Sequence, residues 1–194
     1  MLTELSPKAA EIVACARLLL AAGGYSGFSY ADISAAVNIS KPSIHHHFAT
    51  KAELVHVVLV RYREETRAGV AALEQQTPDP VAQLQMYTAY WAVCIRDGSL
   101  PFCVFAMLAA ELPAIPREVA DEVRGHFSEL SAWLASVLTR GASQKVFFLQ
   151  ATPEEEAKTL MATVHGAMLL ARALGDPEVF PGIVAPLIRR LTTP

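Results

Sequence analysis

Two short helix signals, separated by about four residues, constrain this chain more than any other feature. Ser29 is a good N-cap for a helix over Tyr30–Val37, because its hydroxyl can accept a hydrogen bond from a free N–H group of the first turn. Ser40 caps a second helix over Lys41–Phe48, where Pro42 is tolerated because an early helical N–H group has no partner within the helix. Two short helices with a tight connection predict a helix-turn-helix.

A longer helix is predicted on each side of this pair. Leu5–Ala22 carries apolar residues at helical spacing. Thr50 caps a helix that begins at Lys51, and Glu53, three residues after the cap, completes the pattern of a capping box. The helix-turn-helix is therefore expected to lie between two supporting helices.

The remainder of the chain also has the period of helices. Five further helices are predicted: Val81–Arg96, Phe102–Leu112, Pro116–Arg140, Pro153–Leu174 and Pro177–Leu191. Only the short apolar run Val146–Leu149 could be extended, and the turn-rich stretch Gln75–Pro80 marks the best boundary. We predict an all-α fold in three parts: a three-helix helix-turn-helix domain over residues 1–50, a connecting helix over 51–76 and a larger helical domain over 77–194.

Composition adds limits to this interpretation. The 194 residues are 53% apolar and 18% charged, which leaves more apolar surface than a monomer of this size hides easily, so an oligomer is expected. The first 65 residues hold six basic and six acidic side chains, and the net charge is −3, so nucleic-acid binding would have to depend on where single charges lie.

The chain also lacks the signals of export and of membrane insertion. No signal peptide begins it, and no window reaches the roughly 18 uncharged apolar residues of a membrane span. Three cysteines cannot pair completely, which argues against a secreted disulfide framework. We expect a cytoplasmic protein that does not bind membranes.

The helix-turn-helix would present a polar face to double-stranded DNA. Packing of its apolar residues leaves Lys41, Ser43, His45 and His47 on or near the outward side of the second short helix, where they can meet the major groove and its phosphates. Ser29 and Lys51 lie at helix N-termini, whose N–H groups and dipole favour phosphate. The predicted surface combines phosphate contacts with a few contacts to bases.

The run His45–His47 could instead suggest a metal site. Successive helical residues point about 100° apart, so three adjacent histidines cannot converge on one ion. We predict no metal here. Solvent-exposed histidines without a DNA contact are the remaining alternative.

The segment from Gly24 to Leu54 resembles the TetR/AcrR family of bacterial transcriptional repressors. The residues that match the family pattern are Gly24, Tyr25, Ser29, Asp32, Ile33, Ser40, Lys41, Ile44, His46, Phe48, Lys51 and Leu54. The chain departs from the pattern at Pro42, where the family often has Gly, and at His45 and His47, where it usually has Tyr. The resemblance implies groove and phosphate contacts at Ser29, Lys41, Pro42, Ser43, His45, His46, His47 and Lys51.

The same resemblance implies what the larger domain does. In such repressors the last two long helices form a homodimer interface, the dimer binds a palindromic operator, and a small-molecule inducer releases the DNA. The stretch His165–Pro177 looks like that interface, although an ordinary core would give the same apolar pattern. The domain over 77–194 is therefore expected to serve ligand sensing and dimerisation.

The trigger for release has two candidate forms. Phe102, Cys103 and Val104 partly match the break found in family members that sense electrophiles or oxidants, and a helix N-terminus there would stabilise a Cys103 thiolate. A buried, inert cysteine is the alternative. For a small-molecule ligand the candidate lining residues, each of which could equally be core, are Tyr87, Tyr90, Trp91, Phe102, Met107 and His165.

Catalysis has no support in the chain. It contains no glycine-rich phosphate loop, no nucleophile elbow and no histidine and carboxylate pattern at metal-ligand spacing, so neither an enzyme nor a cofactor is expected. The alternative from a different class is a helical interaction module that does not bind DNA.

Overall fold

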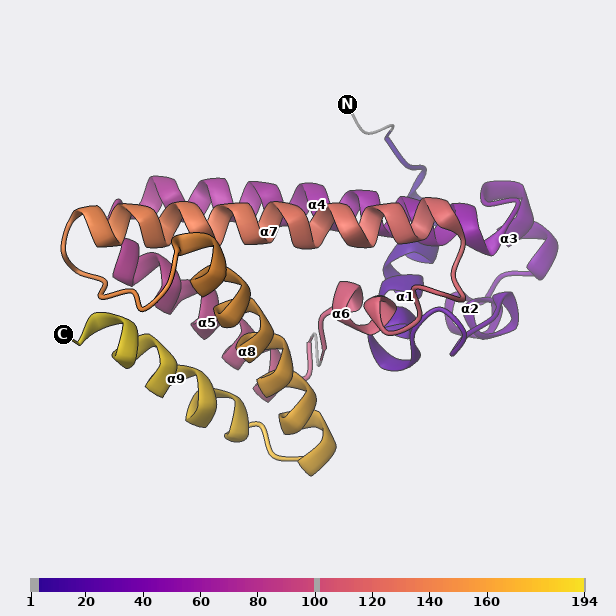
Figure 1. The fold of residues 1–194 in the computed structure, drawn as a ribbon. Coiled ribbons are helices and arrows are strands. Elements are labelled where there is room, and N and C mark those ends of the chain that lie inside the picture. The colour runs from indigo at the N-terminus through magenta and orange to yellow at the C-terminus, as the bar shows by residue number, and fades with distance from the viewer. Residues whose placement is uncertain (1–3, 100–101, 194) are drawn as a thin grey trace. The chain divides into compact units, whose positions relative to one another are not determined.

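The computed structural model describes residues 4–99 and 102–193, and α-helices are the regular elements over that range. Its helices, labelled in Figure 1, are α1 (Pro7–Gly23), α2 (Tyr30–Val37), α3 (Lys41–His47), α4 (Lys51–Gln76), α5 (Pro80–Asp97), α6 (Val104–Ala109), α7 (Arg117–Ser143), α8 (Pro153–Leu174) and α9 (Val179–Thr192). The predicted all-α fold is confirmed, and the bounds of α2 and α8 agree with the prediction at both ends. None of the helices within the described ranges combines the length and apolar character required to cross a membrane.

The chain forms two compact units that do not follow chain order. The first unit contains residues up to Arg67 together with Cys103–His126, and the second contains Ala68–Phe102 together with residues from Phe127 onward. The segment that carries α6 therefore belongs with the N-terminal helices, although the sequence places it beyond α5. The predicted division into functional domains stays a prediction, because compactness alone does not assign a function.

The first unit is built on a small apolar core. Ile12, Leu20, Ile33, Ile44 and Leu54, from the four N-terminal helices, are fully buried. α1 contacts both α2 and α6, and α2 contacts α3 (Figure 1). Burial of one apolar face of each short helix fixes which residues remain on the outside.

Helix caps in this unit follow the sequence closely. Ser29 begins α2, and Ser40 accepts a hydrogen bond from the Ser43 N–H at 3.3 Å. Thr50 accepts from the Glu53 N–H at 3.1 Å, as predicted. A capping box also requires the Glu53 side chain to accept from the Thr50 N–H, and this part of the prediction is wrong. Glu53 Oε2 accepts instead from the Ala49 N–H, at 2.8 Å.

The second unit contains a helical hairpin formed by α8 and α9. The two helices lie side by side, and α9 also contacts α5 (Figure 1). Thr152 and Glu155 form a capping box at the start of α8, and Gly175 ends the helix in the left-handed conformation with φ of 66°. The run 146–149 is not helical, in agreement with the sequence, and the Phe148 N–H donates to the Leu191 carbonyl at 2.8 Å.

One predicted helix is much too long. The sequence predicted Phe102–Leu112, whereas α6 covers only Val104–Ala109. Pro113 disfavours helical backbone at the residue before it, and the chain turns instead, with the Glu111 N–H bonded to the Leu108 carbonyl at 3.0 Å. This early end of α6 leaves Glu111 in a turn.

Candidate functional site

The second short helix of the helix-turn-helix, α3, is held firmly against the rest of the first unit. Ile44 is fully buried, and Phe48 at the end of the helix is almost fully buried. The Tyr30 hydroxyl, from α2, donates to the Phe48 carbonyl at 2.9 Å. This bond satisfies a carbonyl group at the end of α3, and it joins the two helices into one element.

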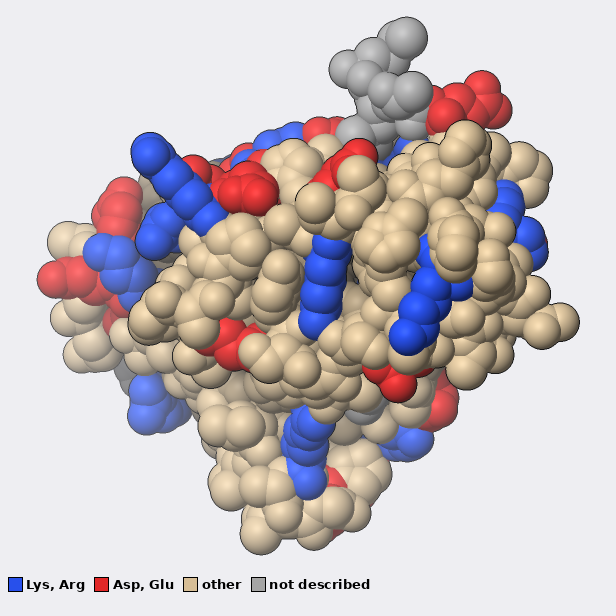
Figure 2. Space-filling view, turned by 90° about the vertical axis from the view of Figure 1, so that its right-hand side faces the viewer, with Lys and Arg blue, Asp and Glu red and all other residues tan. Residues whose placement is uncertain are grey.

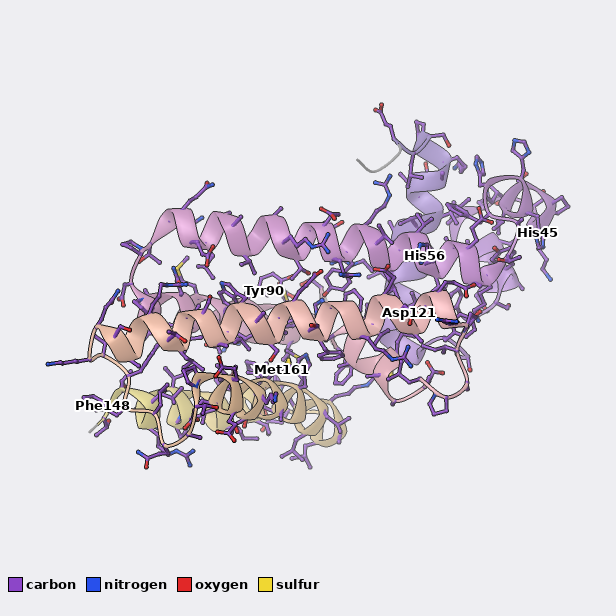
Figure 3. All side chains as sticks on the ribbon, turned by 45° about the horizontal axis from the view of Figure 1, so that its top comes forward. His45, His56, Tyr90, Asp121, Phe148 and Met161 are labelled. Carbon is purple, nitrogen blue, oxygen red and sulfur yellow. The ribbon has the colours of Figure 1, made fainter. Side chains whose placement is uncertain are left out.

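The opposite face of α3 is polar and open. Lys41, Pro42, Ser43, His45 and His46 are exposed, and His47 is half-buried. His45 is labelled on this helix in Figure 3. The structure therefore brings six of the eight predicted DNA-contact residues onto one short helix.

His45 has a defined orientation on this face. Its Nδ1 lies 3.1 Å from the Ala49 carbonyl oxygen, and its ring packs edge-on against Tyr30 with centroids 4.7 Å apart. A carbonyl oxygen only accepts hydrogen bonds, so Nδ1 carries the hydrogen and donates it. In the neutral ring Nε2 is then left as the acceptor.

Ser29 is exposed at the N-terminus of α2. Its hydroxyl donates to Asp32 Oδ2 at 2.8 Å and accepts from the Ala31 N–H at 3.2 Å. The Ser29 hydroxyl bond, together with a bond from the Ser29 N–H at 2.7 Å, holds the pKa of the Asp32 carboxyl below its usual range. The predicted anion site at this N-terminus thus has a carboxylate next to it.

Lys51 does not extend freely into solvent. Its ammonium group donates to the Phe28 carbonyl and lies over two rings, 4.8 Å from the centroid of Tyr25 and 4.1 Å from that of Phe28. Burial lowers the pKa of Lys51, and the nearby Glu111 carboxylate partly offsets this effect. Its side chain supports the turn before α2, and its contact with phosphate stays a prediction.

Positive charge is sparse on the surface of this end of the molecule. Figure 2 shows lysine and arginine side chains standing singly between uncharged surface on the face that is turned toward the viewer. A surface of this kind needs correctly placed contacts rather than a broad basic patch to bind a nucleic acid.

The predicted ligand-lining residues are divided between the two units. Met107 belongs to the first unit, and the second unit contains Tyr87, Tyr90, Trp91, Phe102 and His165. Tyr90, labelled in Figure 3, is exposed, whereas Trp91 and Phe102 are buried. The structure does not gather the whole predicted set in one unit.

Tyr87 and His165 each contact an aromatic side chain of α7. The Tyr87 ring packs edge-on against Trp133 at 5.6 Å, and the His165 ring against Phe127 at 5.3 Å. Burial lowers the pKa of His165, and its Nδ1–H donates to the Met161 carbonyl at 2.8 Å. Trp133 was not predicted as a site residue, because nothing in the local sequence pattern separates it from an ordinary core residue.

Trp133 has an unusual feature for a core residue. Its side chain is only 9% exposed, and its Nε1–H has no hydrogen-bond partner within the part of the chain that the structure describes. A buried donor without an acceptor costs about 1–3 kcal/mol, so an acceptor from a bound molecule would be favourable there.

Cys103 lies at the N-cap position of α6, where the sequence allowed either a stabilised thiolate or a buried, inert thiol. Its exposed fraction is 1%, and burial raises the pKa of the thiol to about 11. Backbone N–H groups of Phe105 and Ala106 do lower the pKa, as a helix N-terminus should, but the loss of water outweighs them. The other cysteines are also free thiols, with Cys94 buried and Cys15 half-buried.

No metal-binding cluster stands out in the described ranges, where no three His, Cys, Asp or Glu side chains are grouped closely enough to hold an ion. In particular, the rings of His46 and His47 are 5.6 Å apart and inclined at 69° to each other.

Comparison with known proteins assigns both parts of the chain to one family. Residues 12–58, which include the helix-turn-helix, match the family described as "Bacterial regulatory proteins, tetR family". Residues 80–184 match "Tetracyclin repressor-like, C-terminal domain". The chain belongs to the TetR family.

A solved structure supports this assignment over almost the whole length. A TetR-family transcriptional regulator from Agrobacterium tumefaciens is 50% identical, with 96% of this chain and 98% of that chain covered and a TM-score of 0.94. This chain is a DNA-binding transcriptional regulator of the TetR family, and the resemblance seen in its first quarter is confirmed.

Two curated TetR-family relatives are more distant. The HTH-type transcriptional regulator CymR of Pseudomonas putida is 29% identical over 140 residues, which are 69% of this chain and 67% of CymR. The HTH-type transcriptional repressor DhaR of Mycobacterium sp. (strain GP1) is 26% identical over 147 residues, which are 75% of this chain and 73% of DhaR.

Proposed function

We propose that this TetR-family regulator represses transcription by binding a palindromic operator as a homodimer, and that a small molecule bound in its second unit releases the DNA. The observation that carries the proposal is the exposed polar face of α3, fixed on its other side by buried Ile44 and by the Tyr30 bond to Phe48. The relative DhaR is named a repressor, which supports the direction of regulation.

The proposed operator contacts divide into two kinds. Lys41, Pro42, Ser43, His45, His46 and His47, on α3, would meet base edges and flanking phosphates, and Ser29 with the backbone N–H of Lys51 would hold phosphates at two helix N-termini. Because His45 and His47 replace the family's usual Tyr, the operator of a relative should be a poor guide to this one.

A mobility-shift titration against the DNA upstream of the gene that encodes this chain tests the proposal. Lys41→Ala should weaken binding and flatten the plot of log affinity against log salt concentration by about one unit for each phosphate that the variant no longer neutralises. Lys145→Ala, which removes an exposed lysine from the turn after α7, is the matched control and should leave the slope unchanged. If the wild type binds no upstream fragment even at low salt, a helical interaction module becomes the better description.

The proposed dimer uses α8 and α9. From Ala162 onward, one face of α8 is exposed and carries only small or apolar residues: Ala162, Gly166, Leu169, Leu170, Ala173 and Leu174. A Cβ atom added to Gly166 of α8 or to Gly182 of α9 would meet nothing within 4 Å in this chain, so both sites leave room for a second copy. A helix-turn-helix protein that reads a palindrome needs two copies, with half-sites roughly 34 Å apart.

The proposed ligand site lies around the aromatic pair formed by Tyr87 and Trp133. The buried Trp133 Nε1–H supports a ligand that offers a hydrogen-bond acceptor, and the aromatic rings support an apolar body. We favour a reversible ligand over thiol modification, because Cys103 is buried and its pKa is raised to about 11.

Alkylation of the native protein decides between these two triggers. Only about one Cys103 thiol in a thousand should be ionised near pH 8, so iodoacetamide should label Cys15 first and Cys103 only after denaturation. Treatment with an electrophile should change operator affinity to the same extent in wild type and in Cys103→Ser. Rapid labelling of native Cys103, together with release that Cys103→Ser abolishes, would instead establish a thiol sensor.

A further inference from the structure

The turn between α1 and α2, residues 24–28, is held by a carboxylate from a distant part of the chain. Glu111 Oε2 accepts from the Tyr25 N–H at 2.5 Å, and Glu111 Oε1 accepts from the Ser26 N–H at 3.1 Å. Both carboxylate oxygens are therefore used on two successive backbone donors. Hydrogen bonds to an ionised acceptor are about twice as strong as those between neutral groups.

The backbone of this turn is shaped to admit the carboxylate. Gly24 has φ of 73° and ψ of −167°, a conformation that is essentially restricted to glycine. A Cβ atom at Gly24 would lie 2.4 Å from Glu111 Oε2. The glycine thus supplies both the direction of the chain and the space in which Glu111 lies.

A cation holds the other end of the same turn. The Lys51 ammonium group donates to the Phe28 carbonyl, and Phe28 immediately precedes the Ser29 cap of α2. The Glu111 carboxylate lies close enough to Lys51 to act on its pKa. The Glu111 carboxylate therefore binds N–H groups near the start of the turn, and the Lys51 ammonium group binds the carbonyl group at its end. The turn leads directly into the helix-turn-helix.

Glu111 also has a distinctive place in the chain. Glu111 is the last residue of the segment Cys103–Glu111, which contains α6. Helix α6 contacts α1, and the segment begins directly after Phe102, the residue at which the second unit's first stretch ends. We propose that Glu111 is a positioning residue for operator binding: it ties the α6 segment to the turn before α2 and so sets how α2 and α3 are presented to DNA. This inference rests on the operator binding proposed above.

Hydrogen exchange of single amides in the full-length protein tests this role directly. In Glu111→Gln the side chain keeps one acceptor oxygen and turns an NH₂ group toward the second donor, and in Glu111→Ala neither bond can form. Exchange at the Tyr25 and Ser26 amides should accelerate roughly tenfold or more in both variants. Asp121→Asn, which removes an equal charge from an exposed site of α7 (Figure 3), should leave these amides unchanged.

Operator affinity supplies the second measurement. With the upstream DNA as probe, both Glu111 variants should bind roughly fivefold or more weakly, while exchange in α8 keeps its wild-type rate. Uniformly faster exchange throughout the first unit, or faster exchange at Tyr25 and Ser26 with wild-type affinity, would overturn the positioning role. If the wild type itself binds no DNA, the repressor proposal fails. The hydrogen-exchange result is independent of DNA binding: unchanged exchange at these two amides in the Glu111 variants would show that the Glu111 contact is absent.

Discussion

Leu170→Glu should convert the proposed homodimer into a monomer and weaken operator binding by roughly a hundredfold to ten-thousandfold, because the second half-site is then no longer bound within the same complex. Leu170 is 44% exposed, and its neighbours Leu169 and Leu174 are 59% and 63% exposed, on the same face of α8. Three large apolar side chains at this exposure on one helix face are unfavourable in a monomer. A carboxylate buried in the dimer without a partner would be more unfavourable still.

Sedimentation analysis and DNA titration of the same preparations check this expectation. Leu18→Glu is the matched control, because Leu18 is an exposed leucine of similar accessibility on α1, outside the α8 face. It should remain dimeric. If the Leu170→Glu protein sediments as a dimer, the proposal that α8 forms the interface is wrong. If the wild type sediments as a monomer, the proposal of a dimer is wrong.

The features that the sequence predicted well are those fixed by neighbouring residues. The ends of α2 depend on the Ser29 cap and on Asn38, which adopts the left-handed conformation with φ of 52°, and both signals lie within the helix or beside it. The polar face of α3 followed from the burial of Ile44 and Phe48, which helical spacing alone requires. Local chemistry therefore sufficed for the helix-turn-helix.

The features that the sequence did not predict depend on distant residues. Glu111 and Tyr25 are 86 positions apart, so no local pattern pairs them. Lys51 was expected to face phosphate because it begins a helix, and only the folded chain shows that the Phe28 carbonyl takes its ammonium group. The sequence left Cys103 open between a thiolate stabilised at a helix N-terminus and a buried, inert thiol, because the burial that raises its pKa comes from tertiary packing.

The buried ion pair between α4 and α7, in the first unit, is a further contact between distant residues that the sequence could not predict. Arg63 donates to Glu122 at 2.6 Å, and both side chains are mostly buried. The guanidinium group also lies against Gly125, where a Cβ atom would come within 2.7 Å of it. A charged residue on a helix is usually solvated, so no pattern in the sequence distinguishes these two from their neighbours. This contact explains why a glycine occupies position 125.

Gly24→Ala should strongly destabilise the first unit, lowering its free energy of unfolding by about 2–4 kcal/mol. Backbone strain at φ of 73° and ψ of −167° accounts for about 1–3 kcal/mol of this. The rest arises because the new Cβ atom would lie 2.4 Å from Glu111 Oε2, so the carboxylate must leave the Tyr25 and Ser26 N–H groups. Chemical denaturation measures the change.

The neighbouring glycine and a double variant separate the two causes. Gly23→Ala adds the same methyl group one residue earlier, within α1 and with nothing inside 4 Å, so its stability should be unchanged or higher by up to about 1 kcal/mol. In a Glu111→Ala background the contact is already absent, so Gly24→Ala should then cost only the backbone strain. Equal costs of Gly24→Ala in both backgrounds would mean that backbone strain alone accounts for the loss and that the new methyl group does not displace Glu111.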